Sequence, residues 1–348
     1  MRALRWHGTR TAAVADDIAM PRIEEPRDAV VRVVRSAICG TDLHPFRGEI
    51  DAFTPGTVTG HEFTGVVEEA GPEARGLRPG DRVVASDIIA CGHCRSCRRG
   101  WHYQCDRVGL FGYSTVVGTR AYDGGHSEYV RVPFADTVLF PIPDDVGDER
   151  ALFIGDVLAT GYACAVGAEV RPGATVAVVG CGPVGLLALE AAWVLGAARV
   201  LAIDPLESRR KLAAERGACP VPATPDVDQQ VADLTDGRGT DAVLEAVGTD
   251  AALLTALDVV RPRGTVCAVG AHASEAMPLP TRLAFAKEIT LRFAVGDPIS
   301  DFEPLMNLVR AGRVDPTFLI SHRMPLAEAA EGFRLFDSGE ASKVVLIP

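Results

Sequence analysis

Ala174-Thr-Val-Ala-Val-Val-Gly180-Cys-Gly182-Pro183-Val184-Gly185 is the stretch that decides the fold of this chain. Its apolar run is typical of a buried parallel strand, and the following run 186–195 favours a helix. The three glycines between them permit a tight turn, a close backbone approach to a pyrophosphate and close packing of helix on strand. The stretch therefore predicts a βαβ unit whose helix N-terminus binds a dinucleotide.

The next apolar run, 199–204, predicts a second strand that ends at Asp204, 19 residues after Gly185. A carboxylate there binds the ribose hydroxyls of NAD, whereas NADP would bring a phosphate against its charge. Arg209 and Arg210 follow closely and keep the use of both cofactors open. Two further buried strands are expected at 242–247 and 265–269. The cofactor-binding residues that we predict in this region are Gly180, Gly182, Pro183, Val184, Gly185, Asp204, Arg209, Val247 and Val269.

Length and charge limit the class of protein. The chain has 348 residues, more than one hydrophobic core usually supports, which favours two domains. Its net charge of −11 argues against a nucleic-acid partner, because phosphate binding requires a basic surface. No signal peptide is evident and the longest apolar runs are too short to cross a bilayer, so we expect a cytoplasmic protein with no membrane association.

Four cysteines, Cys91, Cys94, Cys97 and Cys105, lie close enough in sequence to surround one metal ion. Four thiolates complete a tetrahedral shell and leave no position open, which is typical of a structural zinc. The neighbouring arginines 95, 98 and 99 resemble those of a nucleic-acid-binding zinc loop. On an acidic chain, a solvated loop surface is the better interpretation.

A second candidate metal site combines Cys39, His61 and Asp156. One thiolate, one imidazole and one carboxylate make three ligands and leave a fourth position for water or substrate, which is typical of catalytic zinc. Each residue has an ordinary alternative, because a buried cysteine packs as a small apolar residue, a histidine can be a hydrogen-bonded core residue, and Asp156 can cap a helix.

The motifs together resemble the zinc-dependent medium-chain alcohol dehydrogenases over nearly the whole chain. The matching segments, in the order of the family, are 39–42, 60–66, the four-cysteine loop, 124–130, 160–162 and 180–185. The resemblance implies an α/β fold in which a GroES-like, β-rich catalytic domain (1–156 and 295–348) is interrupted by a doubly wound, parallel-sheet Rossmann domain (157–294). It places the active site in the cleft between the two.

The resemblance also implies the roles of the site residues. Cys39, His61 and Asp156 correspond to the catalytic zinc ligands, with Glu62 beside them as an outer or transient ligand, and the cysteine loop holds a second zinc. Thr41 takes the proton of the alcohol, and His44 passes it through the cofactor ribose to solvent. Lys343 corresponds to a basic residue that contacts the cofactor pyrophosphate. Aspartate in place of the more frequent third cysteine is typical of the formaldehyde-dehydrogenase-like branch.

The implied reaction is reversible hydride transfer between a zinc-bound alkoxide and NAD, giving an aldehyde or ketone. Sorbitol-type polyols are disfavoured because Gly155-Asp156-Val-Leu replaces the Gly-Glu-Pro pattern of the polyol branch. Two alternatives remain: an NADPH-dependent carbonyl reductase on the same scaffold, and a non-catalytic nucleotide-binding zinc protein. Relatives pair through the edge strand of the Rossmann sheet, so we expect a homodimer or homotetramer, with the edge near residues 271–295.

Overall fold

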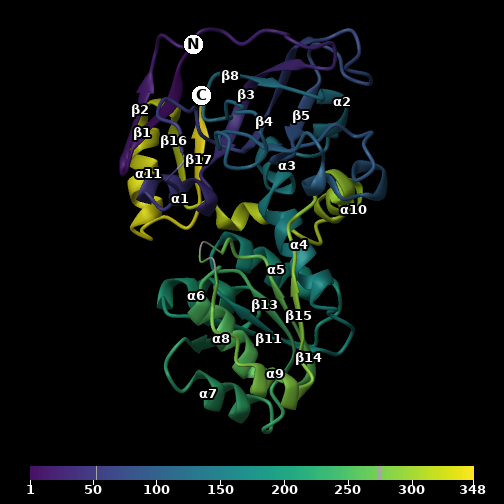
Figure 1. The fold of residues 1–348 in the computed structure, drawn as a ribbon, viewed down its shortest axis with the longest axis vertical. Helices are drawn as coiled ribbons and strands as arrows, with labels where there is room; N and C mark the ends of the chain where they lie inside the picture. The colour runs from purple at the N-terminus through teal and green to yellow at the C-terminus, as the bar shows by residue number, and fades with distance from the viewer. Residues whose placement is uncertain (52, 273, 275) are drawn as a thin grey trace. The chain divides into compact units, whose positions relative to one another are not determined.

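The computed structural model describes residues 1–51, 53–272, 274 and 276–348 (Figure 1). The chain forms two compact units, one of Met1–Asp156 with Asp297–Pro348 and the other of Val157–Gly296. Residues 295 and 296, which we expected in the first unit, belong to the second. The reason is local packing, since Ala294 donates a backbone hydrogen bond to Ala268 and Gly296 lies directly against Thr160.

The second unit is built on six parallel strands in the order β12-β11-β10-β13-β14-β15. The order reverses direction between β10 and β13, and such a switch point is where open α/β sheets bind ligands, at the carboxyl ends of the strands. This is the predicted doubly wound sheet, with β15 at its edge. The strands are β10 (Thr175–Val179), β11 (Arg199–Asp204), β12 (Cys219–Pro222), β13 (Thr240–Glu245), β14 (Val260–Ala268) and β15 (Thr290–Phe293).

Helices cover this sheet. Side chains of α7, α8 and α9 pack with the buried valines, leucines and isoleucines of the strands in one core, while α4 and α5 pack against each other and the sheet. The helix expected at 186–195 begins earlier, at Pro183, because proline is well suited to a first helical turn. The helices are α4 (Val157–Gly167), α5 (Pro183–Val194), α6 (Glu207–Glu215), α7 (Val227–Leu234), α8 (Asp250–Val259) and α9 (Thr281–Lys287).

The first unit is β-rich, as predicted. Its main sheet has the order β16-β17-β3-β4-β5-β9, with β8 paired to β3, and β17 returns the C-terminus of the chain to this sheet. Every pairing is antiparallel except that of β16 with β17. The strands are β3 (Ala29–Ala37), β4 (Glu62–Ala70), β5 (Arg82–Ala85), β8 (Tyr129–Val132), β9 (Leu139–Pro141), β16 (His322–Pro325) and β17 (Val344–Ile347).

Two small hairpin-like pairs and several short helices complete the first unit. The pairs are β1 (Ala3–Gly8) with β2 (Thr11–Ala15), and β6 (Ile88–Ile89) with β7 (Gly109–Leu110). The helices are α1 (Gly40–Arg47), α2 (Ala135–Val138), α3 (Asp148–Leu152), α10 (Pro298–Arg310) and α11 (Ala329–Asp337), and the 3-10 turns are η1 (Cys97–Arg99), η2 (His102–Gln104), η3 (Phe153–Gly155), η4 (Pro316–Leu319) and η5 (Leu326–Glu328).

Among the described residues, no single helix is long and apolar enough to cross a membrane. One bent pair, 148–155 with 157–167, passes the same test of length and composition when its two helices are taken together.

Candidate metal centres and nucleotide-binding turn

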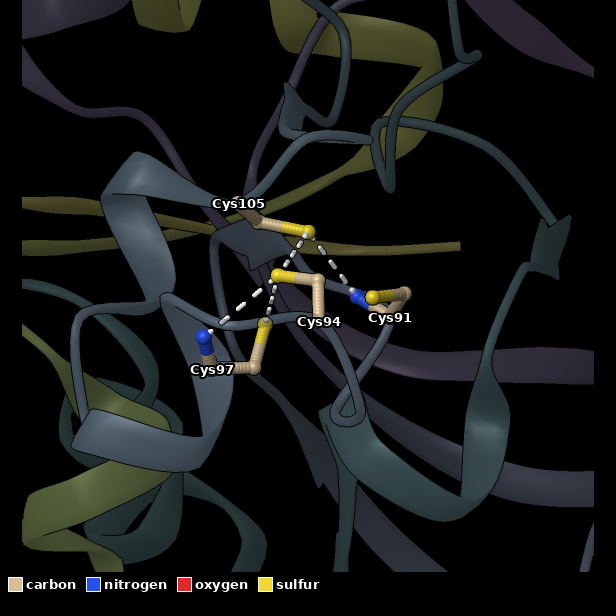
Figure 2. A group of neighbouring side chains, drawn as sticks. All are labelled: Cys91, Cys94, Cys97 and Cys105. Carbon is tan, nitrogen blue, oxygen red and sulfur yellow. Dashed lines mark hydrogen bonds between the residues drawn. The ribbon is translucent and has the colours of Figure 1, made fainter.

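The four cysteines predicted to hold a structural metal converge in the loop between β6 and β7. The Sγ atoms of Cys91, Cys94, Cys97 and Cys105 all lie within 4.8 Å of one another, and Figure 2 shows the four side chains turned toward a common centre. The Sγ of Cys94 is 3.5 Å from that of Cys97 and 4.0 Å from that of Cys105. All four are free thiols, so the geometry fits a closed four-sulfur zinc site.

Backbone amides donate hydrogen bonds to two of these sulfurs. The amides of Cys91 and Arg107 both donate to the Sγ of Cys105 at 3.3 Å, and the amide of Cys97 donates to the Sγ of Cys94 at 3.4 Å. The hydrogen bonds from the amides of Cys97 and Asp106 lower the pKa of the Cys94 thiol to about 6. Amide donors favour the thiolate, which is the form that binds metal.

The loop is fixed to its surroundings at both ends. Gly92 and Gly100 adopt the left-handed conformation, with φ of 78° and 72°, and a Cβ on Gly92 would lie 2.5 Å from the Oγ1 of Thr137. Arg27 donates to the carbonyl oxygen of Cys91 at 2.8 Å. At the other end, Nδ1 of His102 lies 2.9 Å from both carboxylate oxygens of Asp297, the N-cap of α10. His102 is therefore bound to a carboxylate.

The second group of metal-binding side chains also comes together, at the ends of three different elements. Cys39 is the N-cap of α1, His61 and Glu62 lie at the start of β4, and Asp156 follows η3. One ligand atom from each lies within 4.8 Å of the others, and all four residues are buried. The group belongs entirely to the first unit.

Distances within this group fit a tetrahedral ion. The Oδ2 atom of Asp156 lies 3.3 Å from the Sγ of Cys39 and 3.3 Å from the Nε2 of His61. Ligand atoms at about 2.0 to 2.3 Å from a tetrahedral zinc are separated by roughly 3.3 to 3.8 Å. Thiolate, imidazole and carboxylate are all accepted zinc ligands, so the three side chains suit zinc in both chemistry and spacing.

The electrostatics of the group call for a cation. Burial, together with the charge of Asp156, raises the pKa of the Cys39 thiol to about 12. Burial raises the pKa of the Glu62 carboxyl to about 7, although Lys343 acts in the opposite direction. A buried thiol beside carboxyl groups is costly to ionise without a compensating charge, and a divalent metal supplies that charge.

Lys343 requires a correction. We predicted that it contacts the cofactor pyrophosphate, but its side chain is 0% exposed and its Nζ lies 2.5 Å from Oε1 of Glu62. The residue immediately precedes β17, which carries it into the core beside the ring of Phe153. A lysine enclosed in this way neutralises Glu62 and has no accessible surface to offer a phosphate. Glu62 thereby differs from Cys39, His61 and Asp156, because it has a lysine as its own cation.

Asp42 is a site residue that the sequence reasoning missed. Its Oδ2 accepts a hydrogen bond from the Cys39 amide at 2.9 Å, and its Oδ1 lies 3.4 Å from Nδ1 of His61. It therefore contacts two of the three predicted ligands from outside the group, as carboxylates behind metal-bound histidines commonly do. The available signal was its position three residues after Cys39, where an acidic side chain caps the first turn of a helix.

Thr41 and His44 both lie on α1, close in sequence to Cys39. Each is partly buried, and Nδ1 of His44 lies 2.6 Å from Oε2 of Glu49. Their roles as proton acceptor and relay stay predictions.

The glycine turn of the second unit has the geometry expected of a nucleotide-binding loop. Gly180 has φ of 89°, and a Cβ there would lie 2.3 Å from a methyl group of Val247. A Cβ on Gly185 would lie 1.7 Å from the carbonyl oxygen of Gly180, whereas Gly182 faces nearly open space. The first and third glycines are therefore required by packing, and the second leaves room for a ligand to approach the backbone.

Asp204 lies beside this turn at the end of β11. Its Oδ2 accepts from the amide of Cys181 and its Oδ1 from the amide of Leu206, both at 2.8 Å, and Nη1 of Arg209 lies 3.8 Å away. Val247 is exposed at the end of β13, and Val269 is partly buried after β14. The predicted cofactor residues of the second unit thus follow the carboxyl ends of β10, β11, β13 and β14, while Lys343 belongs to the other unit.

Comparison with known proteins places the chain in a family. Residues 25–144 match the model of the alcohol dehydrogenase GroES-like domain, and residues 183–311 match that of a zinc-binding dehydrogenase. A zinc-type alcohol dehydrogenase B of Aspergillus flavus is 36% identical over 99% of this chain and 81% of its own length.

Two solved structures share the fold over the whole chain. The alcohol dehydrogenase TADH from Thermus sp. ATN1 has a TM-score of 0.94 and 42% identity, covering 100% of this chain and 99% of its own. A zinc-binding dehydrogenase of Sinorhizobium meliloti, solved bound to NADP, has a TM-score of 0.86 and 28% identity, covering 100% and 99%. The chain belongs to the zinc-dependent medium-chain alcohol dehydrogenases, and it is an alcohol oxidoreductase that uses zinc and a nicotinamide cofactor.

Proposed function

We propose that this enzyme oxidises a small alcohol with NAD, reversibly, and that it holds two zinc ions with different tasks. The observation that carries the proposal is the contrast between the two ligand groups. Four cysteine sulfurs form one group, which zinc would fill completely, whereas Cys39, His61 and Asp156 form the other and leave a fourth position. A structural zinc and a catalytic zinc differ in this same way.

The residues around the second group suit proton removal from an alcohol. When bound there, zinc supplies the positive charge that lowers the pKa of an alcohol hydroxyl. Thr41, two residues after Cys39, would accept the hydroxyl proton at its Oγ1 as its own proton moves on. His44 is partly exposed and its Nδ1 is held by Glu49 at 2.6 Å, so its ring is oriented and able to exchange a proton with solvent.

We infer a preference for NAD over NADP from Asp204. Its carboxylate is 1% exposed and lies where the ribose of a dinucleotide binds in this fold, so a 2′-phosphate would meet its charge. Arg209, with Nη1 3.8 Å from that carboxylate, is the observation that favours the alternative, an NADPH-dependent carbonyl reductase. The Sinorhizobium meliloti relative binds NADP on the same scaffold, so the side chains here, and not the fold, decide between the cofactors.

We further propose that the enzyme is at least a homodimer. The edge strand β15 has no partner on its outer side within the described sheet, and Phe285 and Phe293 are 87% and 61% exposed. An unprotected edge with exposed aromatic side chains is a liability unless another copy covers it. A homodimer through β15 would satisfy both features, and further pairing of dimers would give a homotetramer.

The test combines metal analysis with kinetics. Zinc per chain is measured by plasma emission in the wild type and in Cys39→Ala, with NAD reduction followed against a panel of alcohols. We expect about two zinc ions to fall to about one, with turnover lost. Cys219→Ala, at a partly buried thiol outside both ligand groups, is the matched control. This variant should keep two zinc ions per chain and full turnover.

One zinc in the wild type, unchanged in Cys39→Ala, would overturn the proposal and favour the non-catalytic alternative. Full activity in Cys39→Ala would do the same for the assignment of the catalytic site.

A further inference from the structure

Asp87 is a partly buried acidic residue beside the catalytic ligand group that the mechanism does not use. It lies between β5 and β6, and its amide donates to the carbonyl oxygen of Gly155 at 2.9 Å. Gly155 immediately precedes the ligand Asp156. The carbonyl oxygen of Asp87 in turn accepts from the amide of Phe111 at 3.3 Å. The backbone of Asp87 is therefore fixed on both sides, next to the segment that supplies the third ligand.

The side chain of Asp87 lacks the partners that its acidic neighbours have. Its Oδ1 is buried without a hydrogen-bond partner, and no ion pair to Asp87 exists among the described residues. Glu62 and Asp42 also each have one oxygen without a hydrogen-bond partner, but the other oxygen of Glu62 is paired with Lys343, and that of Asp42 accepts from the Cys39 amide. An unsatisfied buried polar oxygen costs roughly 1 to 3 kcal/mol, and in a native structure it calls for an explanation.

The groups that act on this carboxyl include members of the catalytic ligand group. Burial raises the pKa of Asp87 well above its usual range, and the charges of Asp156 and Glu62 raise it further. His61 and the amide of Ile88 act in the opposite direction. From the other side, burial and the charge of Asp87 raise the pKa of Tyr103. The carboxyl thus interacts with three of the four residues of the ligand group.

Asp87 is nevertheless separate from the metal ligands. The four residues whose ligand atoms lie within 4.8 Å of one another are Cys39, His61, Glu62 and Asp156, and Asp87 is not among them. Cys39, His61 and Asp156 already supply the three ligands that a catalytic zinc requires. Oδ1 of Asp87 therefore has no partner among the described side chains, and a substrate bound at the neighbouring ligand group can supply one.

We propose that Asp87 determines specificity by hydrogen bonding to a second hydroxyl of the substrate, so that the preferred substrates are alcohols with a hydroxyl next to the reacting carbon. A hydroxyl suits this position because it donates to a carboxylate and accepts from a carboxylic acid, whichever form Asp87 takes. The inference rests on the proposed catalytic site. It adds one polar contact, so it favours short vicinal diols and does not restore the sorbitol-type polyols that the sequence disfavours.

The test compares two isosteric substrates, ethylene glycol and n-propanol, in which a hydroxyl replaces a methyl group. A site built to hydrogen-bond a hydroxyl discriminates strongly against the analogue that lacks it. For the wild type we expect kcat/KM to favour the diol by at least about tenfold. In Asp87→Leu this ratio should fall at least about tenfold, whereas Asp87→Asn, which can still hydrogen-bond, should retain most of it.

A second readout is independent of turnover. Calorimetry in the presence of NADH measures the binding of ethylene glycol and of n-propanol. In Asp87→Leu, the affinity for ethylene glycol relative to that for n-propanol should fall about tenfold. Asp17→Leu, at an exposed aspartate of the same unit, is the matched control and should change neither ratio. Zinc content and melting temperature are recorded for every variant, and Asp87→Asn covers the case in which the leucine variant fails to fold.

The outcomes separate the two proposals. The inference about Asp87 is wrong, and the dehydrogenase assignment stands, if the wild type oxidises both alcohols without preferring the diol. The same holds if Asp87→Leu lowers kcat/KM equally for both substrates at unchanged zinc content. If the wild type oxidises no alcohol, the proposed function fails first.

Discussion

Asp42 and His61 lie with Oδ1 of the carboxylate 3.4 Å from Nδ1 of the imidazole, while Nε2 on the opposite side of the ring faces Asp156 at 3.3 Å. An acceptor beside Nδ1 favours the tautomer with its proton on that nitrogen, and the lone pair of Nε2 is then directed at the metal position. Asp42 also accepts from the Cys39 amide, so one carboxylate orients two ligands.

We therefore expect Asp42→Ala to lower the affinity of the catalytic site for zinc by about 10- to 100-fold, the usual effect of removing such an outer contact. Competition with a chromophoric chelator measures it, and the zinc of the four-cysteine loop serves as an internal reference. Asp51→Ala, at an exposed aspartate close in sequence, is the matched control. Equal zinc affinity in Asp42→Ala and the wild type would show that His61 is oriented by other contacts.

Lys343→Met should strongly destabilise the first unit. The substitution leaves Glu62 fully buried without its cation, and breaking a buried ion pair from one side costs roughly 3 to 5 kcal/mol. Urea unfolding measures the loss. The double variant Glu62→Gln with Lys343→Met should recover part of it, because no isolated charge remains. A loss below about 1 kcal/mol in the single variant would contradict the pairing.

Asp297→Asn should lower stability in a pH-dependent way. Burial acts to raise the pKa of Asp297, but the hydrogen bond with His102, the charge of that ring and the Ser300 amide outweigh it, and the net shift is downward. A carboxyl with a lowered pKa stabilises the folded state above its unfolded pKa of about 4, and this contribution disappears as the pH falls through the folded pKa.

The free energy of unfolding of the wild type should therefore exceed that of Asp297→Asn by about 1 kcal/mol at neutral pH, after screening. This difference should shrink below about pH 4. Asparagine keeps the N-cap of α10, so the comparison isolates the charge. Unfolding midpoints from pH 3 to 8 measure it. A difference that grows toward acid pH would contradict the assignment.

Asp204→Asn should shift cofactor use toward NADP. Removing the charge removes the repulsion of a 2′-phosphate, while the remaining carbonyl oxygen can still accept one of the two amides that Asp204 binds. We expect the ratio of kcat/KM for NADP to that for NAD to rise about tenfold or more. Glu207→Gln, at the first residue of α6, is the control that tests whether removing any nearby negative charge changes the ratio in the same way. An unchanged ratio in Asp204→Asn would separate Asp204 from cofactor choice.

Local patterns predicted the parts of the fold that depend on neighbouring residues. The strand at 199–204 matches β11, and the glycine turn lies where expected because its spacing is set by covalent geometry and close packing. Strand ends were less accurate. β13 stops at Glu245, whose Oε1 accepts the amides of Val247 and Gly248, and β14 begins at Val260, five residues before the apolar run that predicted it.

The site was predictable where residue type alone identifies a metal ligand, as for the cysteines and His61. It was not predictable where a role depends on a distant partner. Glu62 and Lys343 are 281 residues apart in sequence, so nothing local distinguishes a pyrophosphate-binding lysine from a buried counter-ion. Asp42 and Asp87 each look like an ordinary aspartate until the fold brings His61 or Asp156 beside them.

The discontinuous first unit gives the two proposed metal centres a further consequence. The chain leaves this unit after Asp156 and re-enters it at Asp297. The first of these residues belongs to the open ligand group, and the second binds His102 within the four-cysteine loop. Each of the two connections between the units is thus anchored by a different metal-binding group. Loss of either metal would loosen one of the two connections between the units and leave the other anchored. Enzyme that lacks the catalytic zinc and enzyme that lacks the structural zinc would therefore be cut by proteases at different places.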